Sequence, residues 1–226
     1  MSPRVELENI HKHYGSGDNS VAALQNINFT INAAEFVAIE GPSGSGKTTL
    51  LSICGLMDNP DTGSYRLNGQ EITQLTDARR CTQRRSEIGF IFQRHQLIPA
   101  MTVYENIAYA LFLMGAKSRD IKQRVTQMLA RIGLAHRKKH LPGQLSGGER
   151  QRVGIARALI KQPKLIIADE PSANLDHGHA EASLTLMREL NKEHGASVII
   201  ASHDRMIIDH CDRKITLNDG RMENTG

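Results

Sequence analysis

The sequence predicts an α/β fold with a mostly parallel sheet and a smaller antiparallel sheet near the start of the chain. Short apolar runs at 165–168 and 198–201 alternate with helical patterns, which is typical of parallel strands covered on both faces. A third apolar run, at 35–40, leads directly into a glycine-rich loop and then a helical segment at 48–56. This strand–loop–helix order places the loop at the edge of the parallel sheet.

The first third of the chain alternates apolar and polar residues as antiparallel strands do. Strands are predicted over 5–10 and 23–31, separated by a Gly/Ser/Asp/Asn loop at 15–20. An Asn-Gly pair at 68–69 predicts a hairpin turn after another strand at 64–67. These segments form the predicted antiparallel subdomain.

The middle of the chain has helical spacing of apolar residues over 104–114 and 118–132. Ser118 is the predicted N-cap of the second helix, and Gly133 is its predicted C-terminal stop. We therefore expect a block of helices between two parts of a strand-rich core.

At 226 residues the chain is expected to form a single domain around one core. The core with its β subdomain is predicted at approximately 1–95 and 160–226, and the helical subdomain at approximately 96–159. The core's later helices are predicted at 179–194 and 206–211.

Composition argues against several classes of protein. The net charge is 28 − 24 = +4 and aromatic residues make up only 4% of the chain, so a base-stacking nucleic-acid surface is not expected. Three widely spaced cysteines, Cys54, Cys81 and Cys211, indicate a reducing compartment. The sequence has neither a signal-peptide pattern nor a run of eighteen apolar residues, so we expect a cytoplasmic location.

The glycine-rich loop at 41–48 matches GxxxxGK[ST], a phosphate-binding pattern, in the strand-to-helix context that supports it. Its backbone N–H groups and the following helix N-terminus favour phosphate. Lys47 is suited to the β- and γ-phosphates, and the Thr48 hydroxyl to Mg²⁺. The residues expected to bind the nucleotide here are Gly41, Pro42, Ser43, Gly44, Ser45, Gly46, Lys47, Thr48 and Thr49.

Two carboxylates follow the apolar run at 165–168. Asp169 is suited to hold Mg²⁺, mostly through water, and Glu170 to polarise an attacking water. Ligands of α/β sheets bind where the strands end, which favours a functional site over a pair of solvated acids.

Further motifs follow in a fixed order: Gln93 in Phe-Ile-Phe-Gln, Leu-Ser-Gly-Gly-Glu-Arg-Gln-Arg at 145–152, Asn-Leu-Asp at 174–176, and Ser-His-Asp at 202–204. With the phosphate loop and the paired carboxylates, they make nearly the whole chain resemble the ATP-binding cassette of ABC transporters. Two positions depart from the family pattern. Gly154 stands where alanine is usual, and Ser-Ala at 172–173 replaces Thr-Gly.

The resemblance implies a role for several single residues. Tyr14 matches the aromatic residue that stacks on adenine, and Gln93 matches the glutamine that senses Mg²⁺ and the reacting water. His203 matches the histidine that contacts the γ-phosphate and the catalytic glutamate. Asp176 matches the acidic residue that crosses the interface between two cassettes.

The resemblance also implies that two copies of the chain dock head to tail. Ser146, Gly147 and Gly148 then complete the γ-phosphate site of the other copy, at the N-terminus of a helix predicted over 149–160. The expected cycle is closure of the dimer on ATP and release after hydrolysis.

A separate integral membrane permease is implied, because the chain contains no translocation pathway. The motifs are most like those of the lipoprotein-release and macrolide-export subfamily, which works at the cytoplasmic face of the bacterial inner membrane. A groove lined by residues 93–110 is expected to receive a cytoplasmic helix of the permease, with Arg94 and His95 as candidate contacts.

Two other functions are alternatives to a transporter ATPase. A soluble ABC-type ATPase of translation or DNA repair needs a second cassette or a long coiled insertion, and the sequence has neither. A P-loop kinase for a small metabolite leaves the motif at 145–149 without a role.

Overall fold

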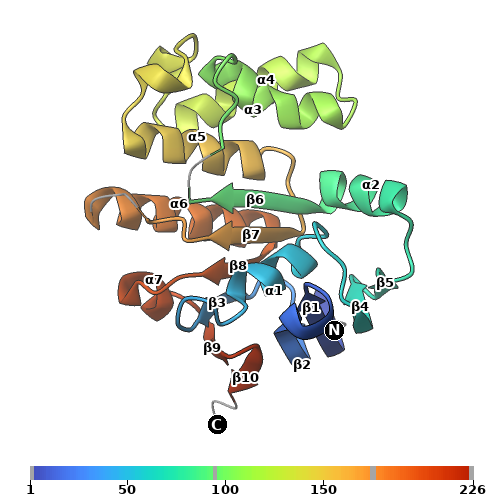
Figure 1. The fold of residues 1–226 in the computed structure, drawn as a ribbon. Helices are drawn as coiled ribbons and strands as arrows, with labels where there is room; N and C mark the ends of the chain where they lie inside the picture. The colour runs from blue at the N-terminus through green and yellow to red at the C-terminus, as the bar shows by residue number, and fades with distance from the viewer. Residues whose placement is uncertain (1–2, 94–95, 174–176, 224–226) are drawn as a thin grey trace.

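The computed structural model describes residues 3–93, 96–173 and 177–223. It contains two sheets and a group of helices that lies to one side of the larger sheet (Figure 1). The smaller sheet is antiparallel, with strand order β2-β1-β4-β5. Its strands are β1 (Val5–Tyr14), β2 (Val21–Ile31), β4 (Thr62–Leu67) and β5 (Gln70–Glu71). The predicted antiparallel sheet is confirmed, with longer first strands than expected.

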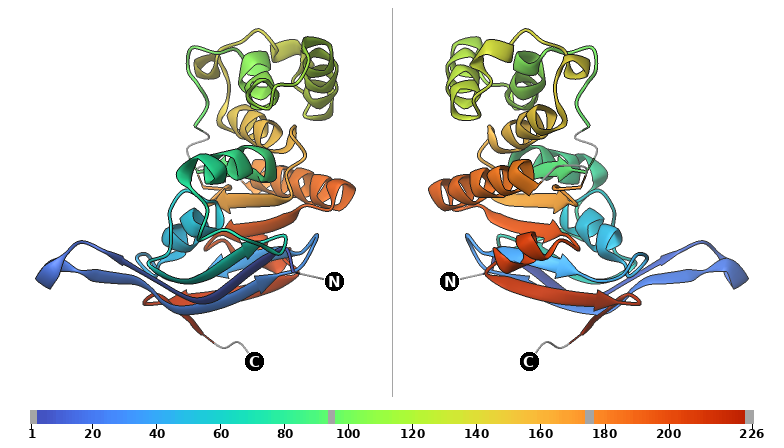
Figure 2. Two further views of the ribbon diagram at one scale, coloured as in Figure 1. Left: turned by 90° about the vertical axis from the view of Figure 1, so that its right-hand side faces the viewer. Right: turned by 90° about the vertical axis from the view of Figure 1, so that its left-hand side faces the viewer.

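Strands β1 and β2 form a long hairpin that extends beyond the body of the molecule (Figure 2). A single 3-10 turn, η1 (Gly17–Asn19), lies at its end. The turn at Gly17–Asn19 therefore lies at the end of a projecting arm, away from the main core.

The larger sheet has the order β10-β9-β3-β8-β7-β6. Strands β9, β3, β8, β7 and β6 run parallel, and β10 pairs antiparallel to β9 at one edge. Its strands are β3 (Phe36–Glu40), β6 (Ile88–Phe92), β7 (Leu165–Asp169), β8 (Ser197–Ala201), β9 (Arg213–Asn218) and β10 (Arg221–Glu223). The predicted fold class, a mostly parallel α/β sheet beside an antiparallel one, is confirmed.

Side chains from alternate positions of β3 enter different cores on the two faces of this sheet. Val37 and Ile39 pack with helix α1 (Lys47–Cys54) and the antiparallel sheet. Phe36 and Ala38 pack on the other side with helices α5 (Gly147–Leu159), α6 (His177–His194) and α7 (Arg205–Asp209). Helices α1 and α5 therefore cover opposite faces of the larger sheet.

A third core lies within the helical group, where α3 (Val103–Leu113) and α4 (Ser118–Arg131) pack with α5. Single 3-10 turns, η2 (Ala135–Arg137) and η3 (Pro142–Gln144), connect α4 to α5. The α3 helix starts with a capping box, because the Thr102 hydroxyl accepts from the Glu105 N–H and the Glu105 carboxylate accepts from the Thr102 N–H.

Helix boundaries in this group agree with the sequence except at one cap. Gly133 has φ +70°, as expected for a residue that ends a helix. The expectation that Ser118 caps α4 is wrong, because Lys117 occupies the N-cap position and its side chain makes no capping hydrogen bond.

Candidate active site

The register of the parallel sheet brings four loops together at the edge formed by the carboxyl ends of its strands. Ile39 of β3 pairs with Ala201 of β8, which pairs with Asp169 of β7, which in turn pairs with Phe92 of β6. The next residues along these strands lead into the phosphate loop, His203, Glu170 and Gln93. Segments more than a hundred residues apart in the sequence thus end at one level, which is where α/β sheets bind ligands.

The loop after β3 has the backbone of a phosphate cradle. Gly46, at the N-cap of α1, has φ +102°, and a Cβ there would lie 2.5 Å from the Ala23 carbonyl oxygen. The Lys47 ammonium donates to the carbonyl oxygens of Gly41 and Pro42, at 2.7 and 2.8 Å. These bonds hold the lysine against its own loop, over which a phosphate would lie.

Glu170 turns the chain sharply after β7. Its φ is +45°, a left-handed conformation that only a few per cent of non-glycine residues adopt. Its N–H donates to the Ala201 carbonyl oxygen at 2.9 Å. Such backbone conformations cluster at functional sites, because the surrounding structure must hold them in place.

His203 lies beside the Glu170 carboxylate, with 2.9 Å between its Nδ1 and Glu170 Oε1. The hydrogen bond and the charge of Glu170 raise the pKa of His203 above its ordinary value, while Lys47 acts against the rise. The Ser202 hydroxyl donates to the other Glu170 oxygen at 3.5 Å. The structure thus brings Lys47, Glu170 and His203 into one electrostatically coupled group.

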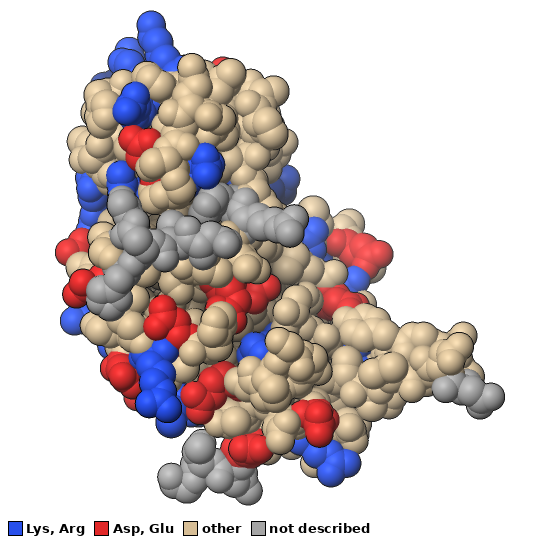
Figure 3. All heavy atoms as spheres, turned by 60° about the vertical axis from the view of Figure 1, so that its left-hand side comes forward, with Lys and Arg blue, Asp and Glu red and all other residues tan. Residues whose placement is uncertain are grey.

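Asp169 is partly buried at the end of β7. Burial raises the pKa of its carboxyl group, the Glu170 charge adds to the rise, and Lys47 opposes it. Seen from the side toward which β6 and β7 point, acidic side chains spread across the middle of the surface (Figure 3). A bound cation at this edge would offset the electrostatic repulsion between the Asp169 and Glu170 carboxylates.

The side chains expected around Mg²⁺ are the Thr48 hydroxyl, the Asp169 carboxylate and the Gln93 amide. These are oxygen donors, the ligands that Mg²⁺ prefers, and a set with one carboxylate suits an ion that keeps waters and binds substrate phosphates. In the described ranges, no group of three or more His, Cys, Asp or Glu could hold a metal by itself. The donor chemistry therefore fits a Mg²⁺ that arrives with a nucleotide.

The motif at 145–149 leads into helix α5, which lies on the face of the larger sheet opposite to α1. Ser146 is the N-cap of α5: its hydroxyl accepts from the Glu149 N–H at 3.2 Å, and the Glu149 carboxylate accepts from the Ser146 N–H at 2.8 Å. Ser146 is exposed, whereas Gly148 is buried in the first turn. Because α5 and α1 cover opposite faces, Ser146 is not brought together with Lys47 of the same chain.

Tyr14 is carried by the antiparallel sheet and not by the parallel one. Tyr14 ends β1 on the projecting hairpin and is 45% exposed. Asp176 lies outside the described residues, and so do the candidate permease contacts Arg94 and His95.

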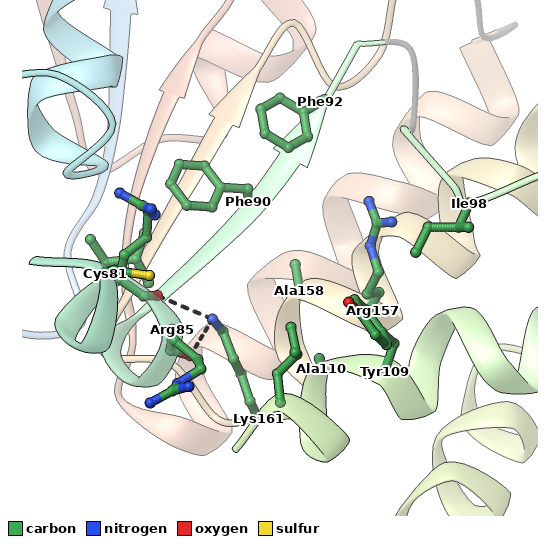
Figure 4. Close-up of a pocket in the computed structure, with 13 residues that line it drawn as sticks. Cys81, Arg85, Phe90, Phe92, Ile98, Tyr109, Ala110, Arg157, Ala158 and Lys161 are labelled. Atoms are coloured by element: carbon green, nitrogen blue, oxygen red, sulfur yellow. Dashed lines mark hydrogen bonds between the residues drawn. The ribbon is translucent and has the colours of Figure 1, made fainter. Parts of the chain in front are cut away.

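A groove of about 450 Å³ lies between the helical group and helix α2 (Asp77–Glu87) (Figure 4). Its apolar side chains include Phe90, Phe92 and Tyr109. Lys161 also lines the groove, and its ammonium donates to the carbonyl oxygens of Arg84 and Arg85, at 3.3 and 2.7 Å. The groove overlaps the predicted one but also takes in α2 and Lys161.

The sequence does not predict helix α2, because its apolar residues, Ala78 and Cys81, give no helical periodicity. A weaker signal was present. Asp77 lies in the first turn and Arg84 and Arg85 lie in the last turn, which suits the helix dipole.

Comparison with known proteins agrees with this geometry. The family model described as "ABC transporter" matches residues 24–173. The chain is 40% identical over 219 residues to the "Lipoprotein-releasing system ATP-binding protein LolD" of Shewanella frigidimarina, covering 97% of this chain and 92% of that protein. It is also 40% identical over 222 residues to the protein of the same name in Geobacter metallireducens, covering 98% and 99%.

Solved structures are similar over the same length. The dimeric post-hydrolysis structure of the ATP-binding cassette MJ0796 bound to ADP and Pi has a TM-score of 0.89 and 38% identity, covering 97% of each chain. The cbiO1 structure from Clostridium perfringens, part of the ABC transporter complex cbiONQ, has a TM-score of 0.88 and 31% identity, covering 99% of this chain and 88% of that one. The chain therefore belongs to the ABC transporter family, as a LolD-like ATP-binding subunit that hydrolyses ATP for transport.

Proposed function

We propose that two copies of this chain bind two ATP molecules between them and drive a separate inner-membrane permease, in a system of the lipoprotein-release type. The observation that carries the proposal is the division of phosphate-binding segments between the two faces of the larger sheet. Lys47, Glu170 and His203 lie together at the sheet edge, whereas Ser146 begins a helix on the far face.

Glu170 is proposed as the general base for the attacking water, with His203 orienting its carboxylate through the 2.9 Å contact. Lys47 then exchanges its bonds to the Gly41 and Pro42 carbonyl oxygens for the phosphates. Mg²⁺, held through Thr48, Asp169 and Gln93, would neutralise charge that develops on the phosphates. The main-chain cradle at 41–49 supplies the remaining contacts.

The second copy is proposed to supply Ser146, Gly147 and Gly148 to the γ-phosphate. The Ser146 hydroxyl and the free N–H groups of the first turn of α5 suit an anion. The similar MJ0796 cassette is dimeric with ADP and Pi bound, which supports a dimer here. Asp176 is assigned to the same interface.

The permease is proposed to dock in the groove between α2 and the helical subdomain at approximately 96–159. The groove combines apolar side chains with basic residues at its rim, which suits a short amphipathic helix. No helix within the described ranges is both long and apolar enough to cross a membrane. We propose that the chain is a peripheral protein, which its permease holds on the cytoplasmic face of the bacterial inner membrane. The names of the LolD relatives suggest that the transport reaction is lipoprotein release.

The proposal is tested with Glu170→Gln. Removing the general base should slow ATP hydrolysis by about 10²–10⁴-fold, leave ATP binding intact and trap a dimer. The measurements are steady-state phosphate release, ATP affinity and size-exclusion chromatography with ATP.

Glu40→Gln is a matched control. Glu40 ends β3 at the same edge, but its carboxylate accepts from the Thr216 hydroxyl at 2.9 Å and lies 3.6 Å from Lys214. This variant should retain hydrolysis. A Glu170→Gln rate within twofold of wild type would contradict the assignment of the base.

A further inference from the structure

The phenol of Tyr14 is held by a residue distant in sequence. Its hydroxyl donates to Asp58 Oδ2 at 2.7 Å, and Asp58 lies in the loop between α1 and β4. This bond ties the end of the projecting hairpin to the segment that follows the phosphate-loop helix. Burial raises the pKa of Tyr14, the bond to Asp58 adds to the rise, and Thr49, close to the hydroxyl, opposes it. The Tyr14 hydroxyl therefore lies near Thr49, in the first turn of α1.

Lys12 completes the arrangement from the same strand as Tyr14. Its ammonium donates to Asp58 Oδ1 at 2.9 Å and to the Asn59 carbonyl oxygen at 2.7 Å. It also lies 5.2 Å from the centroid of the Tyr14 ring, within the range of a cation–π contact. The Lys12 side chain is only 11% exposed, so these bonds fix its position.

The two oxygens of Asp58 are thus divided between Tyr14 and Lys12. Burial works against the ionised carboxyl group, but the hydrogen bonds from Tyr14 and Lys12 outweigh it, so the pKa of Asp58 is lowered. The Tyr14 ring has Lys12 near it and is still 45% exposed. An aromatic ring fixed at its hydroxyl, with open surface remaining, is a preorganised stacking surface.

We propose that Asp58 and Lys12 are positioning residues for the nucleotide base, because they hold the Tyr14 ring in the orientation in which adenine stacks on it. The inference rests on the proposed function, together with the match of Tyr14 to the family's adenine-stacking aromatic residue. Without Asp58, Tyr14 at the end of the hairpin regains rotamer freedom that stacking must remove again, and base affinity falls.

The test measures affinity for two probes on the full chain by calorimetry with Mg²⁺. One probe is a non-hydrolysable ATP analogue, and the other is inorganic triphosphate, which has no base. Asp58→Ala and Tyr14→Phe should each weaken the analogue about fivefold, which corresponds to about 1 kcal/mol, the typical worth of one hydrogen bond. Triphosphate affinity should change less than twofold, and the double variant should be no weaker than either single one.

Steady-state kinetics and a conservative variant separate positioning from a general structural defect. Asp58→Ala should raise the KM for ATP about fivefold with kcat unchanged. Lys12→Met should also raise the KM, and Lys12→Arg should bring the KM back toward the wild-type value, because arginine keeps a positive charge beside the ring. Glu71→Ala is the control: Glu71 is a hydrogen-bonded carboxylate of the same antiparallel sheet, but it accepts from Ser64 and Thr73. It should leave the KM unchanged.

The outcomes distinguish this inference from the function on which it rests. Equal losses for the analogue and for triphosphate would overturn it, because they would indicate general damage to the phosphate loop. If Tyr14→Ala leaves analogue affinity unchanged, the base does not stack on Tyr14 and the proposed base site is wrong. If Tyr14→Ala weakens the analogue but Asp58→Ala and Tyr14→Phe do not, only the positioning role of Asp58 and Lys12 fails.

Discussion

Two glycines of the phosphate loop offer a direct comparison between steric overlap and backbone strain. Gly41 has φ +150°, and a Cβ placed there would lie 2.1 Å from the Leu217 carbonyl oxygen and 2.8 Å from Ser45 Oγ. Gly44 has φ +82°, and a Cβ there would meet no protein atom within 4 Å. Gly41→Ala and Gly44→Ala therefore make the same chemical change in the same loop with different consequences.

The expected losses follow from these distances. A left-handed backbone costs an alanine about 1–2 kcal/mol, which is the whole expected penalty at Gly44. At Gly41 the added methyl overlaps the β9 backbone, which cannot rotate away as a side chain can. Forced repacking adds about 1–3 kcal/mol, so the total at Gly41 is about 2–5 kcal/mol. Each kcal/mol lowers the Tm of a chain of this size by about 2–4 °C.

The assay is urea unfolding of both variants and wild type without nucleotide, followed by circular dichroism, with Tm as a second measure. Omitting nucleotide removes the contribution of ligand binding to stability. Gly41→Ala should lower the free energy of unfolding clearly more than Gly44→Ala. Equal losses, or a larger loss at Gly44, would refute the reasoning, because strain rather than contact with β9 would then dominate at both positions.

Two other predictions concern the dimer and the groove. Mixing Ser146→Arg subunits with Lys47→Ala subunits should restore one intact composite site per heterodimer. The ATPase activity of the mixture should therefore exceed that of either variant alone. If the activity does not recover, Ser146 does not act on the partner's nucleotide. Burial lowers the pKa of Lys161 from 10.5 to about 8, with Glu87 opposing the shift, so the unfolded chain binds this proton more tightly. As the pH rises from about 8 to about 10, the free energy of unfolding of wild type, measured by urea titration, should increase relative to that of Lys161→Met. The same dependence of this free energy on pH in both proteins would contradict the prediction.

The parts of the fold that the sequence predicts well have strong local signals. The apolar runs of β3, β7 and β8 and the phosphate loop between β3 and α1 are each recognisable within about ten residues. Their order then limits the topology, and the edge that carries Glu170 and His203 follows from the way parallel strands end. The fold class needed no long-range information.

The parts of the fold and of the site that the sequence does not predict depend on contacts between residues distant in sequence. Strands β9 and β10 are short and mixed in polarity, and they are defined by pairing with β3 and with each other. The link between Tyr14 and Asp58 spans 44 residues and involves a loop without a motif. The Glu170 backbone conformation likewise depends on β8, because its N–H donates to Ala201. Local patterns do not encode such pairings.

The position of Ser146 also bears on why ATP would control assembly. Its hydroxyl oxygen already accepts from the Glu149 N–H in the α5 capping box, so the hydroxyl proton and the first N–H groups of α5 are what this segment can offer a phosphate. Lys47 is likewise bonded to carbonyl oxygens of its own loop. Without nucleotide, dimerisation would bring these polar surfaces together with little gain in free energy. In the proposed dimer, the γ-phosphate supplies the negative charge that both the Lys47 ammonium and the α5 N-terminus favour, so closure depends on ATP and weakens once the phosphate is cleaved.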